Sequence, residues 1–369
     1  MELKKIHISD IGKIVTGKTP KTSVAENYDG DIPFLTPSDD LSHKSAPKTT
    51  KTLTEQGLNE VRNSLLPPRS ICVSCIGSDL GKVVMTIEPT VTNQQFNSIV
   101  PNKNFNADFV YYLMTLVGRE LNYLSKTSTA VPIINKSSFS NYKIEAPDLE
   151  TQKNIASILS SIDSKIELNR QVNDNLEQQA QALFNEMFPH ITEGENMIGD
   201  LIMPKRGKGL LSKNAIKGDI PVVAGGIEPA TYHNQANTTA PVLTIAASGA
   251  NAGYINLWHI PVWASDSSYI DDSITPNVYF WYIMLKKRQK EIFDAQVGSA
   301  QPHIYPKHIA ELPMNVVFVD KIAEYNEIIT PIFEKKGQLF LESKRLTSLR
   351  DTLLPKLMSG ELKINDINN

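Results

Sequence analysis

Residues 12–19 read Gly-Lys-Ile-Val-Thr-Gly-Lys-Thr, a letter-for-letter match to the loop that binds nucleotide phosphates in many NTPases. Such a loop follows a buried strand, and a helix begins at its lysine and threonine so that backbone amides face the phosphates. Here the preceding segment, residues 4–10, is polar and too short for a buried strand. Pro20 follows the threonine directly, and the residues after it show no apolar helical face. The sequence therefore favours a turn over a nucleotide site.

The rest of the chain carries no recognisable catalytic motif. Cys72 and Cys75 lie in an apolar run, which is typical of buried thiols, and they have no second pair to complete a zinc site. His303 and His308 lack a set of partner ligands. We find no glycine-rich cofactor loop, no Asn-Pro-Pro-Tyr methyltransferase motif and no paired-carboxylate nuclease motif. We expect no catalytic residue, no metal and no cofactor in this chain.

Hydrogen-bonding side chains gather in two segments that suit nucleic-acid recognition. Residues 92–97 read Thr-Asn-Gln-Gln-Phe-Asn, and residues 265–269 read Ser-Asp-Ser-Ser-Tyr. Asn and Gln can bond adenine edges, and Lys and Arg can bond guanine edges, although polar turn chemistry is an alternative explanation. We expect DNA contacts from a set of polar and charged residues: Lys18, Lys21, Thr36, Ser38, Asp79, Lys82, Gln94, Lys205, Arg206, Lys208, Asn251 and Ser267.

These segments fall at matching places because the chain repeats itself. Residues 30–33, 77–81, 111–114 and 130–132 return as residues 218–221, 249–253, 281–284 and 300–302. The spacing between the copies shrinks between the first and second of these pairs and is nearly constant from there, with one fixed value from Met114 onward. A constant spacing indicates a rigid scaffold, and a variable one indicates surface loops, where binding residues concentrate. Two copies with an approximate two-fold relation suit double-stranded DNA, which has the same local symmetry.

Each copy ends in a long helical stretch. Apolar residues recur at the heptad period between residues 150 and 187, with Asn169 on the same seam. The second stretch, residues 320–358, contains Pro331 and Gly337, which we expect to kink or delay it. Two such rods could pair antiparallel, and a coiled coil for simple dimerisation is the alternative. The expected packing residues are Ile155, Ile162, Ile166, Leu176, Leu183, Ile332, Leu339, Leu346 and Leu353.

Composition fits a globular protein of two or more domains. The chain has 369 residues, of which 41% are hydrophobic and 21% charged. Two cysteines and the lack of a signal peptide or a long apolar run predict a cytoplasmic protein with no membrane segment. The net charge of −3 is unusual for a chain that binds DNA alone, so positive surface would have to come from local clusters or partners.

The chain resembles the specificity subunit of type I restriction-modification systems over essentially its whole length. Residues 11–20, 30–34 and 74–82 are similar to the family's target recognition domain. Residues 149–156 and 161–169 resemble its first conserved helix. Residues 349–362, Leu-Arg-Asp-Thr-Leu-Leu-Pro-Lys-Leu-Met-Ser-Gly-Glu-Leu, resemble its second and form the most specific motif. In copy two Asp320-Lys321-Ile322 replaces Glu150-Thr151-Gln152, a departure from the pattern that questions symmetric docking.

The resemblance implies a non-catalytic subunit that binds a bipartite DNA target. Each recognition domain would bind one half-site, and the helices would fix the gap. The helices would also dock two adenine methyltransferase subunits, which use S-adenosylmethionine, and restriction subunits driven by ATP and magnesium would join them.

The expected fold is α+β, with two similar mixed α/β recognition domains related by a pseudo-two-fold and separated by two long antiparallel coiled-coil helices. The expected segments are domain 1 at 1–147, helix 1 at 148–189, domain 2 at 190–317, and helix 2 with a C-terminal tail at 318–369. Two rival functions remain: a coiled-coil adaptor that binds only protein, and a stand-alone enzyme, either a nucleotide hydrolase or a methyltransferase.

Overall fold

The computed structural model describes residues 1–77, 80–125, 133–298 and 301–363. The chain forms two compact units, each made of a globular part and a portion of two long helices. Unit 1 comprises Met1–Glu167 and Ser343–Asn369, and unit 2 comprises Leu168–Glu342. Unit 1 is therefore discontinuous in sequence and unit 2 is continuous, because both long helices pass from one unit into the other.

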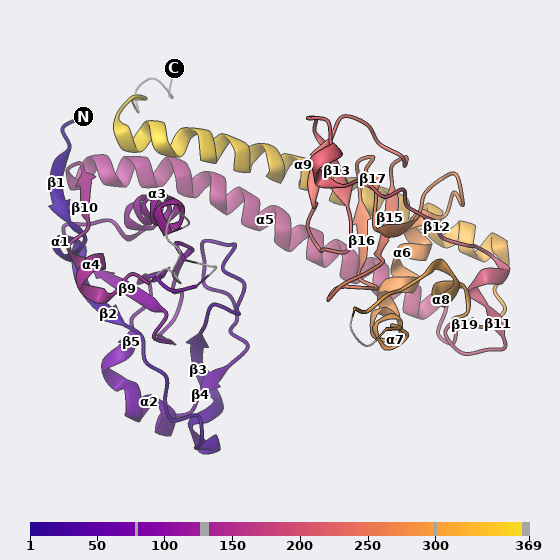
Figure 1. The fold of residues 1–369 in the computed structure, drawn as a ribbon, viewed down its shortest axis with the longest axis horizontal. Coiled ribbons are helices and arrows are strands. Elements are labelled where there is room, and N and C mark those ends of the chain that lie inside the picture. The colour runs from indigo at the N-terminus through magenta and orange to yellow at the C-terminus, as the bar shows by residue number, and fades with distance from the viewer. Residues whose placement is uncertain (78–79, 126–132, 299–300, 364–369) are drawn as a thin grey trace. The chain divides into compact units, whose positions relative to one another are not determined.

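In unit 1, helix α3 (Ala107–Ser125) lies beside α5 (Leu149–Met187) (Figure 1), and its apolar residues pack against the long helices and against one of three small sheets. The sheets have strand orders β2-β9-β6-β7, β4-β3-β8-β5 and β1-β10. The strands are β1 (Lys4–His7), β2 (Gly12–Thr16), β3 (Tyr28–Leu35), β4 (Thr52–Leu53), β5 (Leu65–Leu66), β6 (Ile71–Ser74), β7 (Val83–Met85), β8 (Thr90–Thr92), β9 (Phe96–Pro101) and β10 (Lys143–Ala146). The helices are α1 (Ile8–Ile11), α2 (Glu55–Val61), α3 (Ala107–Ser125) and α4 (Lys136–Ser140), followed by the long helix α5 (Leu149–Met187).

Unit 2 has the same kinds of sheet, with orders β12-β18-β15-β16, β14-β13-β17 and β11-β19. The strands are β11 (Asn196–Met197), β12 (Lys205–Arg206), β13 (Ile220–Val223), β14 (Thr231–His233), β15 (Val242–Ala246), β16 (Ile255–Trp258), β17 (Trp263–Ala264), β18 (Ser267–Ile270) and β19 (Pro313–Met314). The helices are α6 (Val278–Lys287), α7 (Gln289–Asp294) and α8 (Pro306–Ala310), followed by the long helix α9 (Val319–Ser359).

Matching hydrogen bonds show that the two units are copies of one structure. The Gly81 amide donates to the Ser74 carbonyl, and the Gly253 amide donates to that of Ala246, both at 2.7 Å. The paired glycines of both turns, Gly77 with Gly81 and Gly249 with Gly253, all have φ between 82° and 90°, where a side chain would be strained. The predicted fold class, two similar mixed α/β units with two long helices, is confirmed.

The long helices run antiparallel within each unit. In unit 1, Asp163 of α5 pairs with Arg350 of α9, and in unit 2, Glu177 pairs with Lys336. As residue numbers increase along α5, the residue numbers of the partners on α9 decrease. Of the expected packing residues, Ile155 and Leu339 are buried, and Ile162, Ile166, Leu176, Leu183, Ile332, Leu346 and Leu353 are half-buried.

The heptad pattern does not describe the whole buried surface of these helices. Leu349, which lies within the predicted second helical stretch, is 48% exposed. Conversely Leu159, Phe184, Tyr325 and Leu354 are fully buried, since each helix has a second apolar face that packs against a globular part. In unit 2, Phe184 lies 5.6 Å from Phe280 and 5.5 Å from Tyr325 between ring centroids. A search for one seam misses this second face.

Asn169 occupies the seam as its position predicts, and it is 1% exposed. Its amide nitrogen donates to the Glu342 carboxylate at 2.8 Å. A buried amide that has a partner only in one alignment of two helices disfavours other alignments. Asn169 is thus suited to fixing the alignment of α5 with α9.

The expected interruption of the second helix is wrong, because α9 is helical from Val319 to Ser359 through both Pro331 and Gly337. The Pro331 ring is exposed, so it does not disturb packing. Gly337 provides space instead: a Cβ there would lie 2.9 Å from the imidazole of His259, which follows β16. Burial, with a further contribution from Lys336, lowers the pKa of this histidine to about 4.

We expect this half-buried histidine to make the protein less stable in mild acid. An unfolded histidine has a pKa of about 6.5, so below that pH the unfolded chain binds a proton that the folded chain does not. The His259 contribution falls by about 1.6 kcal/mol between pH 6.5 and pH 5. Urea unfolding at both pH values, on the parent and on His259→Leu, measures it. An equal loss in both proteins would exclude His259 as the cause.

Candidate nucleic-acid interface

The candidate interface of unit 1 is built where strand β2 ends. The amides of Gly17 and Lys18 donate to the carbonyls of Phe96 and Thr92, at 3.1 and 2.9 Å. A Cβ at Gly17 would lie 2.0 Å from the Asn93 carbonyl oxygen, so only glycine allows this approach. The loop 17–19 is thereby held against the loop 93–95.

Polar side chains connect these two loops at the same end of the sheet. The Thr19 hydroxyl donates to the exposed Gln94 side chain at 2.6 Å. The side-chain amide of Asn93 donates to the side-chain oxygen of Gln95 at 2.9 Å. Since Ser74 pairs with Phe96, the turn that begins at Gly77 follows β6 at this same end. The result is an exposed polar edge with hydrogen-bonding groups and the Lys18 ammonium.

Unit 2 repeats this arrangement with different side chains. The amides of Gly207 and Lys208 donate to the carbonyls of Ser267 and Ala264, at 2.8 and 2.9 Å. At the place of the Gln94 loop, the Asp266 carboxylate accepts from Arg206 at 2.6 Å and from the Ser248 hydroxyl. The two edges therefore share a backbone frame and differ in charge.

The expected site residues divide into exposed and buried ones. Exposed or half-exposed residues of these edges are Lys18, Lys21, Ser38, Lys82, Gln94, Lys205, Arg206, Lys208 and Asn251. The Lys21 amide donates to Glu60 of α2, and the Lys205 ammonium donates to Ser273. Asp79 lies outside the described residues.

Thr36 and Ser267 do not fit the expected role. Thr36 is 9% exposed, and its hydroxyl and amide bind Asp39. Ser267 is fully buried, and its hydroxyl donates to the Val223 carbonyl at 3.3 Å. The loop before β18 is shorter by a single position than the loop before β9, so Ser267 occupies the place of buried Phe96. In a strand, a shift by a single position turns a side chain to the opposite face.

Two side chains of these edges are not among the individual DNA contacts expected from the sequence. Asp266 lies between Arg206 and Ser248, and Thr19 bonds Gln94. The positions of both side chains follow from the shared backbone frame. In it, the end of β2 lies beside the loop before β9, and the end of β12 lies beside the loop before β18. The shortening of the second loop relative to the first is the signal that could have placed Asp266.

The structure also settles the apparent phosphate loop, since Gly12–Thr16 forms strand β2 and no helix begins at Lys18. Burial raises the pKa of the Cys72 thiol to about 12 and raises that of Cys75 as well. In the part of the chain that the structure describes, no group of three or more His, Cys, Asp or Glu is placed to hold a metal. None of the described helices is long and apolar enough to cross a membrane.

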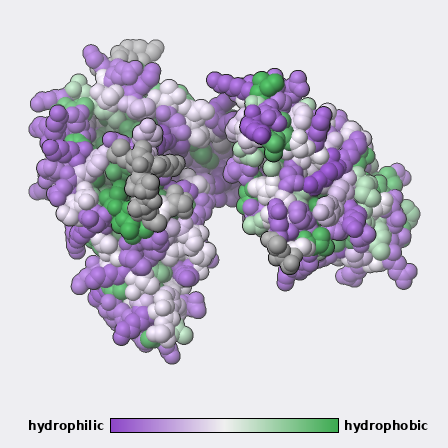
Figure 2. Space-filling model, viewed as in Figure 1, coloured by the Kyte–Doolittle hydropathy of each residue, from purple (hydrophilic) through white to green (hydrophobic). Residues whose placement is uncertain are grey.

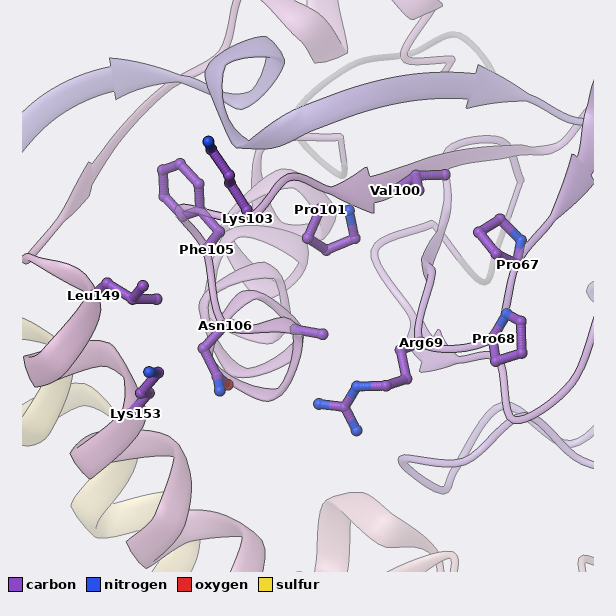
Figure 3. A pocket seen from close by; sticks show the side chains of 11 residues that line it. Pro67, Pro68, Arg69, Val100, Pro101, Lys103, Phe105, Asn106, Leu149 and Lys153 are labelled. Atoms are coloured by element: carbon purple, nitrogen blue, oxygen red, sulfur yellow. The ribbon is translucent and has the colours of Figure 1, made fainter.

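A cavity of about 470 Å³ lies at the opposite end of the β2-β9-β6-β7 sheet, between the starts of α3 and α5 (Figure 3). Lys103 and Lys153 line it, together with Arg69, which pairs with Asp108 at 2.6 Å. Because the cavity is remote from the edge that holds Lys18, it is not part of the duplicated interface.

Figure 2 shows that hydrophilic residues cover most of the visible face of both units.

Comparisons with known proteins agree with this duplicated structure. Residues 1–178 match the family model described as "Type I restriction modification DNA specificity domain". The type I MjaIX specificity subunit of Methanocaldococcus jannaschii is 25% identical over 99% of this chain and 94% of that protein. The HindI specificity subunit of Haemophilus influenzae is 37% identical over 41% of this chain and 34% of that protein. The solved type I S subunit from M. genitalium has a similar fold, with a TM-score of 0.56 and 21% identity over 97% of this chain and 96% of that chain.

Proposed function

Because this chain belongs to the specificity subunits of type I restriction-modification systems, we propose that it binds a bipartite target in double-stranded DNA and has no catalytic role itself. The observation that carries this proposal is the repeated edge: Lys18 and Lys208 follow glycines that are held in the same way against the opposite loop. Two matching edges in one chain suit two half-sites of one duplex.

The two half-sites would differ in sequence. Gln94 stands at one edge and Asp266 at the corresponding loop of the other. A glutamine side chain suits adenine, whose major-groove edge offers both a donor and an acceptor, whereas a carboxylate accepts from the amino group of cytosine. The shared frame positions the contacts, and the differing side chains select the bases.

The long helices would set the gap between the half-sites. Helix α5 has 39 residues and α9 has 41. At a rise of about 1.5 Å per residue, each is roughly 60 Å long, longer than one turn of DNA at about 34–36 Å. Rods of this length can hold two recognition edges on separated half-sites.

The same helices would dock the methyltransferase subunits, which use S-adenosylmethionine, and the complex would accept ATP- and magnesium-dependent restriction subunits. Leu168, Phe340 and Leu349 are apolar side chains of these helices, exposed by 53, 42 and 48%. Leu168 belongs to α5, and Phe340 and Leu349 belong to α9, so both long helices offer apolar side chains to partner subunits. Partner subunits would also supply positive surface, which a chain of net charge −3 lacks.

We expect Lys18→Ala and Lys208→Ala each to weaken DNA binding by the complex at any sequence. Each lysine that neutralises a phosphate contributes about 0.9 to the slope of log affinity against log salt concentration. Titration of duplex DNA at several salt concentrations should show that loss for either variant. Lys103→Ala, at the opposite end of the sheet, is the matched control and should leave the slope unchanged. Parental slopes in both test variants would contradict the proposed edges.

A further inference from the structure

A tyrosine at the same position of each copy reaches from the globular part to the long helices. The Tyr112 hydroxyl, on α3, donates to the Asp163 carboxylate of α5 at 2.5 Å. The Tyr282 hydroxyl, on α6, donates to the Glu177 carboxylate of α5 at 2.7 Å. The two tyrosines correspond in the repeat, since residues 111–114 return as residues 281–284. Both are buried, at 1% and 6% exposure.

Each carboxylate also binds a cation of α9. Arg350 donates to Asp163 at 2.8 Å, and Lys336 donates to Glu177. We call these three-residue groups the unit 1 joint (Tyr112, Asp163, Arg350) and the unit 2 joint (Tyr282, Glu177, Lys336). Each joint connects a helix of the globular part with both long helices.

Only the tyrosines follow the repeat. In the register that matches the tyrosines, the counterparts of Asp163, Glu177, Arg350 and Lys336 are Phe333, Thr347, Ala180 and Ile166. Duplication would have moved the acid and the cation to the opposite helices, yet α5 carries the acid in both joints. The ion pairs therefore differ in origin while they make the same connection. That coincidence favours a role beyond inherited packing.

The joints add directional hydrogen bonds to contacts that are otherwise non-directional. Around them, apolar side chains pack α3 and α6 against the long helices, and such burial is not directional. A short hydrogen bond to a charged, partly buried group holds only within a narrow range of distance and angle. Burial and the neighbouring carboxylate raise the pKa of both tyrosines, so both remain donors.

In unit 1 the joint also reaches the segment between β3 and β4. The Lys44 ammonium lies 2.9 Å from the Ser160 hydroxyl of α5, 3.3 Å from the Tyr112 hydroxyl and 2.8 Å from Asp108. Lys44 belongs to the segment between β3 and β4, which also contains Ser38. The orientation of that segment is thus tied to the helix pair.

We propose that the two joints are positioning groups that restrict the protein to one gap between half-sites. This inference rests on the proposed function and adds to it the residues that set the selectivity. Adjacent base pairs differ by about 3.4 Å along the duplex and by about 35° around it. A recognition domain held only by apolar contacts could adjust to a neighbouring gap, whereas a directional bond to a charged group resists the change.

The test is the double variant Tyr112→Phe with Tyr282→Phe in the full chain, expressed with its methyltransferase subunits. Methylated adenines are mapped and sorted by gap length. We expect unchanged half-sites and about tenfold more methylation at gaps one base pair longer or shorter, relative to the parental gap. An unchanged distribution of gaps overturns the inference.

Matched controls separate positioning from general loosening. Tyr111→Phe and Tyr279→Phe remove hydroxyls from other buried tyrosines of the same two helices, outside the joints. They should leave the gap distribution unchanged, and a wider distribution in these controls overturns the inference. If the double variant fails to fold in thermal melting, each single tyrosine variant gives the same readout. If the parental protein itself directs no bipartite methylation, the proposed function fails instead.

Discussion

Removal of one heptad from each long helix, residues 166–172 and 340–346, is expected to shorten the gap by up to about three base pairs. Seven helical residues account for about 10.5 Å, and base pairs are about 3.4 Å apart. The two segments face each other, since Asn169 bonds Glu342. Both joints lie outside them, at Asp163 with Arg350 and Glu177 with Lys336. Mapping of methylated adenines in cells that carry the shortened protein measures the gap directly.

The half-site sequences should not change in this experiment, because both recognition edges lie outside the deleted segments. A control variant keeps both helices at their parental length and replaces only exposed residues within the same two segments. It should keep the parental gap. An unchanged gap after the deletion, or altered half-sites, would show that the helices do not measure the spacing.

Exchange of residues 1–147 for the corresponding part of another specificity subunit is expected to replace one half-site completely. The edge formed by residues 17–19 and 93–95 lies within this segment, and α5 begins after it, at Leu149. The donor should keep Tyr112 and Asn106, whose amide donates to the Gln152 side chain at 3.0 Å. Methylation mapping should show one new half-site, one old half-site and the parental gap.

The reciprocal exchange, of residues 190–317, serves as the control and should alter only the other half-site. Should either exchange change both half-sites, the two edges would not recognise DNA independently. This outcome would contradict the assignment of one half-site to each unit.

The repeat made most of the fold predictable. Glycine pairs such as Gly77 and Gly81 return with the same φ, because a tight turn admits few other residues. The heptad period located both long helices. Local signals were misleading at Pro331 and Gly337, where tertiary packing decides: a proline on the exposed face is tolerated, and a glycine makes room for His259.

The two candidate edges were predictable only in part. Lys18 and Gln94 were predicted as DNA contacts from residue type and repeat position, and the structure places both at one exposed edge. Ser267 was misplaced because a single deletion in a loop changes which side chains of the next strand face outward. The partners of Tyr112 and Tyr282 depend on how two distant helices align, which no local pattern specifies.

The departure of copy two from the family pattern has a structural counterpart. Ile322 stands where copy one has Gln152, and its side chain is buried. Asn326, one helical turn further along α9, accepts from the Phe280 amide at 3.2 Å, as Gln152 accepts from the Asn106 amide in copy one. A polar side chain of the long helix therefore binds the start of the neighbouring helix in both copies, from different positions.

We expect this chain alone to select a split DNA target for methylation. The most direct test of this role maps methylated adenines across the genome with the gene present and after its deletion. We expect a bipartite motif with one fixed gap, which disappears on deletion and returns when the gene is restored. Methylation that persists without the gene, or that never depends on a two-part motif, would contradict the claim.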